Sequence, residues 1–328
     1  LVGAGEIGRA HLPTLLQLAD TKVIGVADPI IAAAEALAAR SGATAFADYR
    51  QLLGKIDAVW ICTPTFLHPE QSILFAGAGV HVFCEKPIAL DLPSADRMIT
   101  AARSAGVQLM IGQVIRYFPE TIAIKKLLID GELGDPVYVY ARRLFTRSTA
   151  LTEGWRRDVK TSGGMTLESG VHEVDTVRWL GGEIVNVGGN VVYSDPANPD
   201  FDTDFRGVFR LKGGATGAVE VSTYAALRDW SWGIVGTKAT ALSPRRGEIQ
   251  IARAGAIAGE TALNIIPVDP VYDSARQVNR TMLAENQAFV DAIRDGQPVP
   301  IPGEEGRRNL EVILTVKKVA QEKVLLAV

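Results

Sequence analysis

The feature that most constrains the fold is a regular alternation of short apolar runs and helical segments over the first 112 residues. Strand-length apolar runs separated by helices are typical of a parallel, doubly wound α/β sheet, because parallel neighbours need a crossover connection. Leu1 and Val2 end a further strand, which we expect to begin upstream of this numbering. The apolar runs are 23–27, 58–62, 80–84 and 107–111, and the helical segments are 11–18, 31–40, 66–78 and 92–105.

A glycine-rich turn stands at the start of this alternation. Gly3, Gly5 and Gly8 fit the G-x-G-x-x-G spacing. In that motif the first glycine makes the turn, the second lets the backbone approach a pyrophosphate, and the third lets the helix pack on the strand. Glu6 and Ile7 lie inside the turn, at the helix N-terminus that would face the phosphates, and are also candidate cofactor-binding residues. Alone, this spacing is a weak signal.

Asp28 strengthens the signal because it ends the second apolar run, about twenty residues after Gly8. An acid at this place accepts hydrogen bonds from the ribose 2′-hydroxyl and repels a 2′-phosphate. Pro29 follows, where an NADP-preferring enzyme would often have an arginine. We therefore expect NAD rather than NADP as cofactor. The alternative is that Asp28 only caps the alanine-rich helix 31–40.

The third apolar run ends abruptly in Glu85, Lys86 and Pro87. Ligands of open α/β sheets bind outside the carboxyl ends of the strands, which is where Lys86 emerges. Pro87 keeps Lys86 out of the helical region and so fixes a stiff corner, at which a cis peptide can occur. The alternative is a surface Glu-Lys pair capping the strand. Thr63 and Pro64 end the neighbouring run and are expected to line the nicotinamide site.

The glycine-bounded segment 162–182 is expected to form one helix. Glu168 and His172 lie four residues apart, and Asp175 lies three further on, so all three would share one helical face. A carboxylate one turn before an imidazole can orient it and raise its basicity, as a general base requires. The alternative is an i,i+4 pair on a solvated helix face.

The pattern changes after Gly112, where strand-like runs separated by glycine-rich turns predict a mostly antiparallel sheet. We place a dinucleotide-binding Rossmann domain at 1–116 and a substrate-binding and oligomerisation α+β domain at 117–328, whose last helix is a candidate to pack back on the first domain. The later runs are 137–144, 184–193, 205–211, 217–223 and 230–235, and the helices are 122–129, 281–293 and 304–321.

Composition narrows the classes of partner. The chain is 47% hydrophobic and 22% charged, as globular proteins are, and its net charge of -3 without a block of like charges gives no reason to expect nucleic acid or a membrane surface. No apolar run reaches the ~18 residues of a spanning helix, and we expect no secretory leader.

Cys62 and Cys84 lie in apolar runs as buried thiols, so we expect a cytoplasmic protein. Because no His/Cys cluster has ligand spacing, we predict no metal site.

Together, the glycine turn, Thr63-Pro64, Glu85-Lys86-Pro87 and His172-Glu173-Val174-Asp175 resemble the glucose–fructose oxidoreductase/inositol dehydrogenase/MocA (Gfo/Idh/MocA) family, in the family's order and over nearly the whole chain. The resemblance implies a Rossmann domain followed by an α+β domain whose sheet often forms a homodimer or homotetramer interface. It also implies NAD(H) or NADP(H) as cofactor, and sugars, polyols or inositols as substrates.

The resemblance also implies roles for individual residues. Lys86 matches the lysine that polarises the reacting hydroxyl, His172 matches the general acid/base, and Glu168 stands where many members have an assisting aspartate. Glu85 and His68 are expected near the cofactor, the second because the family often has a histidine there. Weaker matches are the expected substrate-binding residues Arg116, Tyr117, Trp155 and Arg157, although packing is the alternative role for Trp155.

These features favour an NAD-dependent dehydrogenase of a sugar, polyol or inositol hydroxyl. His172, assisted by Glu168, would take the hydroxyl proton as hydride leaves the carbon, and Lys86 would stabilise charge on the same oxygen. Two alternatives stay open: an NAD-retaining glycoside hydrolase or lyase, and a catalytically silent regulator that senses NAD or sugar. Substrate choice is expected to depend on loops around 145–160 and 224–232.

Overall fold

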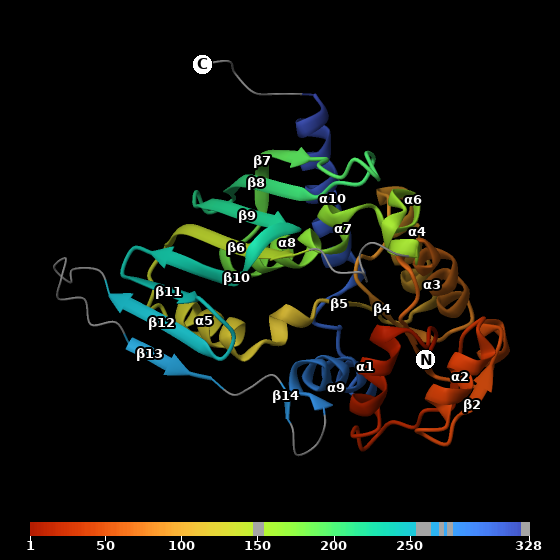
Figure 1. Ribbon diagram of the computed structural model, residues 1–328. Helices are drawn as coiled ribbons and strands as arrows, with labels where there is room; N and C mark the ends of the chain where they lie inside the picture. The colour runs from red at the N-terminus through yellow and green to blue at the C-terminus, as the bar shows by residue number, and fades with distance from the viewer. Residues whose placement is uncertain (147–153, 254–263, 269–271, 274–277, 323–328) are drawn as a thin grey trace. The chain divides into compact units, whose positions relative to one another are not determined.

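The computed structural model describes residues 1–146, 154–253, 264–268, 272–273 and 278–322 (Figure 1). The chain divides into two compact units, the first made of 1–117 and 271–310, the second of 118–270 and 311–328. Part of the expected substrate loop, 147–153, lies outside the described residues. Among the helices of the described ranges, none has both the length and the apolar content needed to cross a membrane.

The first unit is built on a parallel sheet. Val2 forms bridges to Ala27 on one side and to Ile61 on the other, and so joins a two-stranded and a three-stranded ladder. The order across the sheet is β2, β1, Val2, β3, β4, β5, which is the strand order of the Rossmann fold. The predicted doubly wound parallel sheet is therefore confirmed. The strands are β1 (Gly25–Ala27), β2 (Thr44–Phe46), β3 (Ala58–Ile61), β4 (His81–Glu85) and β5 (Leu109–Gly112).

The central strands of this sheet are buried on both faces, which explains why they read as continuous apolar runs. Val59, Val82 and Ile111 are fully buried. Phe83 on β4 stacks against Trp60 on β3, and Phe289 on α9 meets both rings edge-on. A late helix of the chain thus completes the core of the first unit. The helices are α1 (Glu6–Leu15), α2 (Ile31–Ala38), α3 (His68–Gly77), α4 (Leu92–Ala105) and α9 (Arg280–Arg294).

The second unit is built on an eight-stranded sheet with the order β13, β12, β11, β10, β6, β9, β8, β7 (Figure 1). Every neighbouring pair is antiparallel except β6 and β9, which are parallel, so the predicted mostly antiparallel sheet is confirmed. The strands are β6 (Pro136–Thr146), β7 (Ile184–Val192), β8 (Asp204–Leu211), β9 (Thr216–Ser222), β10 (Tyr224–Gly236), β11 (Ala239–Ser243), β12 (Glu248–Arg253) and β13 (Asn264–Pro267).

One face of this sheet is covered by helices. Helix α8 (Gly170–Gly181) packs on β6 and β9, and α5 (Pro119–Ile129) packs against β11 and β12. Burial alternates along β8, where Phe205 and Phe209 are buried while Val208 is 57% exposed. The period-2 alternation separates a core face from an outer face.

The prediction of one helix over 162–182 is wrong. The segment contains the end of α6 (Val159–Ser162), then α7 (Met165–Glu168), then α8. Gly163 and Gly164 have left-handed φ angles of 77° and 86° and form the turn before α7. The α-helical hydrogen-bond pattern breaks at Ser169. The His172 amide donates to the Ser169 carbonyl oxygen, three residues earlier, instead of to the Glu168 carbonyl oxygen. The neighbouring Gly170 lacks a Cβ, which would lie 3.3 Å from the Phe205 ring, so the chain can approach the sheet closely.

Candidate active site

The glycine-rich turn has the shape that its three glycines predict. Gly3 has φ 97°, and a Cβ on it would lie 2.7 Å from the Cys62 carbonyl oxygen. A Cβ on Gly8 would lie 2.0 Å from the Gly3 carbonyl oxygen, whereas a Cβ on Gly5 would meet nothing within 4 Å. The turn and helix need the first and third glycines, while the space beside Gly5 stays open. An open space at the N-terminus of α1, beside the exposed Glu6, fits a pyrophosphate.

Asp28 is tied to the same turn. Its Oδ2 accepts a hydrogen bond from the Ala4 amide at 2.8 Å, and its Oδ1 accepts one from the Ile30 amide at 2.9 Å. A carboxylate has about four lone-pair sites, so each oxygen retains acceptor capacity for a ribose hydroxyl. The capping alternative does not hold, because the N-cap of α2 is Ile30 and has no side-chain cap bond.

Glu85 and Lys86 stand at the carboxyl end of β4, and the Lys86–Pro87 peptide bond is cis. The Lys86 amide donates to Oε2 of Glu85 at 3.1 Å, and Oε1 of Glu85 lies 2.9 Å from Nε2 of His11. Burial raises the pKa of Glu85, but the hydrogen bond and charge of His11, together with Lys86, hold it below its ordinary value. Glu85 is only 9% exposed, so it is not half of a surface pair.

His68 connects two loops at this edge of the sheet. Its Nδ1 lies 2.8 Å from the Pro87 carbonyl oxygen and its Nε2 lies 2.9 Å from the Thr63 carbonyl oxygen. Its side chain is 1% exposed. The Thr63 hydroxyl donates to Gln71 on α3 at 2.7 Å. The structure thus brings together the predicted residues Thr63, His68 and the Lys86 loop within the first unit.

The two residues predicted at the domain junction also lie in the first unit. Arg116 is 8% exposed and forms an ion pair of 2.5 Å with Glu305, in the first turn of α10 (Gly303–Gln321). Tyr117 is half-buried, and its burial, followed by the charge of Glu285, raises its pKa. The buried Arg116 is thus held by an ion pair with the partly exposed Glu305.

In the second unit, Glu168 ends α7 and His172 lies in the first turn of α8. Both residues are 8% exposed, and Asp175, one turn further on, is 1% exposed. The alternative of a Glu-His pair on a solvated helix face is therefore wrong. Buried titratable side chains that cluster within a short segment are typical of functional sites, because burying such groups costs free energy.

Arg156, which the sequence interpretation did not select, contacts Glu168. Its Nε lies 3.3 Å from Oε1 of Glu168, and its guanidinium lies 4.8 Å from the centre of the Trp155 ring. The neighbouring Arg157 is exposed, and its Nη2 donates to the Ala197 carbonyl oxygen at 3.3 Å. The short 3-10 turn at 154–157 determines which of the two adjacent arginines faces Glu168. The sequence alone therefore did not distinguish Arg156 from Arg157.

A second buried group holds the turn before α7. Asp202, fully buried, accepts hydrogen bonds from the Thr166 amide at 2.6 Å and from the Thr166 hydroxyl. Lys317 on α10 lies 3.4 Å from Oδ1 of Asp202 and donates to the Gly163 carbonyl oxygen at 2.5 Å. Burial raises the pKa of Asp202, while Lys317 acts to lower it. This group positions α7 and therefore Glu168.

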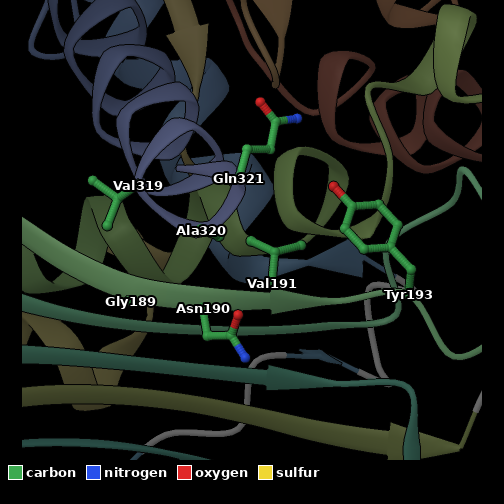
Figure 2. Close-up of a pocket in the computed structure, with 7 residues that line it drawn as sticks. All are labelled: Gly189, Asn190, Val191, Tyr193, Val319, Ala320 and Gln321. Carbon is green, nitrogen blue, oxygen red and sulfur yellow. The ribbon is translucent and has the colours of Figure 1, made fainter. Parts of the chain in front are cut away.

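A cavity of about 310 Å³ lies in the second unit between β7 and the end of α10 (Figure 2). Figure 2 shows the side chains of Tyr193 and Gln321 beside Val191 and Val319 at its wall. None of its lining residues is a predicted site residue. This cavity is therefore separate from the Glu168–His172 group.

Comparison with known proteins decides the family. The family model described as "Oxidoreductase family, NAD-binding Rossmann fold" matches residues 1–113, and the one described as "GFO/IDH/MocA C-terminal domain" matches residues 121–242. The chain belongs to the Gfo/Idh/MocA family. It is accordingly an NAD-dependent oxidoreductase with an NAD-binding Rossmann domain.

Relatives within the Gfo/Idh/MocA family include two named inositol dehydrogenases. Inositol 2-dehydrogenase of Rhizobium meliloti (strain 1021) is 34% identical over 184 residues, which cover 56% of this chain and 54% of that protein. Myo-inositol 2-dehydrogenase of Thermotoga maritima is 27% identical over 98% of this chain and 96% of its own length. A structure of levoglucosan dehydrogenase with NADH and levoglucosan has a TM-score of 0.88 at 23% identity, covers 98% of this chain and 96% of that chain, and shares the fold.

Proposed function

We propose that this Gfo/Idh/MocA member oxidises a secondary hydroxyl of a sugar, polyol or inositol. The observation that carries the proposal is the buried pair of Glu168 and His172 at the junction of α7 and α8, in a chain that also has Lys86 at the end of a Rossmann strand. The names of the two inositol dehydrogenase relatives support the substrate class.

The first unit contains the residues that we propose to hold the cofactor. NAD, when bound, supplies the acceptor for the hydride that leaves the carbinol carbon. The open space at Gly5 and the free acceptor capacity of Asp28 fit its pyrophosphate and ribose. Asp28 would repel a 2′-phosphate, which supports NAD over NADP. The residues that we propose to hold the cofactor are Gly3, Gly5, Glu6, Ile7, Gly8, Asp28, Thr63, Pro64, His68, Glu85 and Lys86.

Each polar residue has a defined role in the proposed reaction. The His172 imidazole accepts the hydroxyl proton as general base, because its ordinary pKa lies near neutrality. The Lys86 ammonium donates a hydrogen bond to the same oxygen and stabilises the negative charge that develops on it. Glu168 assists His172, and the Arg156 guanidinium, 3.3 Å from Oε1 of Glu168, holds that carboxylate in place.

Four residues remain proposed substrate contacts. Trp155 is half-exposed and can present its ring to the apolar face of a sugar, while Arg157 is exposed and carries donors for hydroxyls. Arg116 and Tyr117 follow the strand end of β5. We propose that both contact substrate, with Arg116 held in place by its ion pair with Glu305.

We further propose that the protein is a cytoplasmic homodimer or homotetramer that associates through the outer face of the second unit's sheet. Val208 is exposed on that face of β8, and exposed apolar residues on a sheet face favour association. Cys62 and Cys84 are not joined in a disulfide, which agrees with a reducing compartment.

The proposal is tested by absorbance at 340 nm. The purified protein is mixed with NAD or NADP and a panel of inositols, aldoses, sugar acids and polyols. We expect one compound to produce NADH, faster with NAD than with NADP, and His172→Ala to lower kcat by at least ~100-fold while NADH still binds. NADH binding without turnover on any compound would contradict the proposal and favour a sensor; product formation without NADH release would favour an NAD-retaining hydrolase or lyase.

A further inference from the structure

We propose that His11 is a positioning residue that fixes the backbone of Lys86 through Glu85. His11 lies on α1, far from Glu85 in sequence, and is fully buried. Its Nε2 lies 2.9 Å from Oε1 of Glu85 and its Nδ1 lies 3.1 Å from Oδ1 of Asn286 on α9. The imidazole therefore links α1, β4 and α9 inside the first unit.

The orientation of the Asn286 amide follows from its two other hydrogen-bond partners, Trp60 and Thr14. The Trp60 indole N–H donates to Oδ1 of Asn286 at 2.9 Å, so this oxygen is an acceptor. The Thr14 hydroxyl donates to the His11 carbonyl oxygen and therefore accepts from Nδ2 of Asn286, at 2.6 Å in both cases. The Asn286 amide is thus oriented, and it presents an acceptor to His11.

Acceptor oxygens therefore lie at both ring nitrogens of His11, with Oδ1 of Asn286 at Nδ1 and Oε1 of Glu85 at Nε2. The hydrogen bond to the Glu85 carboxylate is the charge-assisted one of the two. Gly112 on the adjacent strand β5 leaves the space that this carboxylate occupies, because a Cβ there would lie 3.0 Å from Oε1 of Glu85. His11 therefore fixes the orientation of the Glu85 carboxylate.

The fixed carboxylate in turn holds the peptide that carries Lys86. Oε2 of Glu85 accepts the Lys86 amide hydrogen at 3.1 Å. On the other side of Lys86, the Pro87 carbonyl oxygen contacts His68 at 2.8 Å. The backbone is held both before and after Lys86, so the base of the ammonium-bearing side chain has one position. Small displacements of a catalytic group have large effects on rate.

Two substitutions of His11 separate its two hydrogen bonds. In His11→Asn the amide nitrogen occupies about the place of Nδ1, so the bond to Asn286 can persist while the bond to Glu85 is lost. In His11→Gln the amide nitrogen reaches about the place of Nε2, so the donor to Glu85 is restored. If Glu85 transmits the effect, only His11→Asn should disturb Lys86.

The test measures hydrogen exchange at the Lys86 amide in the full chain, together with kcat. We expect exchange at least ~10-fold faster in His11→Asn and close to wild type in His11→Gln. The kinetic part depends on the proposed dehydrogenase function: we expect kcat to fall ~10-fold or more in His11→Asn, with recovery in His11→Gln.

Unchanged exchange in His11→Asn, or equal losses of kcat in both variants, would overturn the proposal. Should His11→Asn fail to fold, Glu85→Asp provides the second variant, because its shorter side chain cannot reach both His11 and the Lys86 amide; slow exchange at Lys86 in this variant would also overturn the proposal. A wild-type protein without any turnover would refute the dehydrogenase function alone, since hydrogen exchange reports on Lys86 independently.

Discussion

Three glycines within the first eight residues have different physical roles. Gly3 adopts a left-handed φ, and Gly8 allows α1 to approach the turn. Gly5 has φ -71° and ψ -164°, which any residue can adopt, and faces open space. The fold therefore does not require glycine at this position, whereas the proposed binding of the cofactor does.

This difference predicts that Gly5→Ala separates binding from stability. The free energy of unfolding should stay the same or rise by up to ~1 kcal/mol, because alanine restricts the unfolded chain. NADH affinity should fall at least ~10-fold, since the added methyl occupies the space of the pyrophosphate. Calorimetric titration with NADH and urea unfolding measure the two effects. Gly213→Ala, in an open turn of the second unit, is the matched control and should change neither by much.

A pH dependence of stability follows from Glu85. Its folded pKa lies below the ordinary value of 4.5. The charged pair with His11 therefore stabilises the fold above about pH 4.5, and this contribution is lost as the pH falls through the folded pKa. We expect Glu85→Gln to cost ~3 kcal/mol at pH 7, because it leaves His11 buried without its charged partner.

Urea unfolding of wild type and Glu85→Gln between pH 3.5 and pH 7 measures this difference. The gap between the two free energies of unfolding should shrink as the pH falls below about 4.5. Glu304→Gln is the control, because Glu304 forms an exposed pair with Arg103 and should cost less than ~1 kcal/mol. A gap for Glu85→Gln that widens toward acid would contradict the account.

At the scale of elements, the turn before α7 sets the position of Glu168. Gly164 has a left-handed φ, and a Cβ on it would lie 1.7 Å from Oδ1 of Asp202. Asp202 in turn holds the Thr166 amide in the first turn of α7 and is paired with Lys317. Asp202, just before β8, and Lys317 on α10 therefore support the short helix α7.

We predict that Gly164→Ala lowers kcat at least ~10-fold and destabilises the protein by ~2 kcal/mol, because a left-handed residue with a Cβ is strained and α7 must shift. NADH affinity should be unchanged, since the Rossmann turn lies in the other unit. Gly182→Ala, at the left-handed end of α8 with nothing within 4 Å of its Cβ, measures the backbone strain alone and should keep most of the activity.

The elements that the sequence predicted well are those with a strong local signal. The apolar runs of β3, β4 and β5 and the helix over 92–105 have the expected type and nearly the expected bounds. Strand β2 was missed because it has three residues and no buried side chain. Strands β11 to β13 were also missed: β11 consists mostly of small residues, β13 has four residues, and the alternation of Ile249 and Ile251 on β12 is short.

Prediction of the candidate site from the sequence failed where contacts between distant parts of the chain determine the local structure. The break at Ser169 lies beside the close approach of Gly170 to Phe205, a contact between distant residues that periodicity does not reveal. Arg156 faces Glu168 because of a 3-10 turn whose sequence gives no distinctive pattern. His11 is buried in the core, and its partner Glu85 comes from a strand distant in sequence, so no local pattern indicates the contact.

At the scale of the whole molecule, the outer face of the second unit's sheet is the proposed contact between copies. Val208→Arg places a charge on that face, and burying an unpaired charge is costly. We expect wild type to sediment as a dimer or tetramer and the variant to shift toward monomer in analytical ultracentrifugation. Ile129→Arg, at the 73% exposed end of α5, is the control and should leave the assembly intact. A monomeric wild type would refute the proposed interface.

The central claim is that hydride passes from a substrate carbon to NAD and leaves with the cofactor. The most direct measurement uses the substrate identified by the panel, with deuterium on the carbon that bears the reacting hydroxyl, and mass spectrometry of the released NADH. The account predicts one deuterium in each molecule of released NADH, and loss of this transfer in Lys86→Ala and His172→Ala. Released product whose deuterium has returned to carbon, with no net NADH, would contradict it and identify an NAD-retaining hydrolase or lyase.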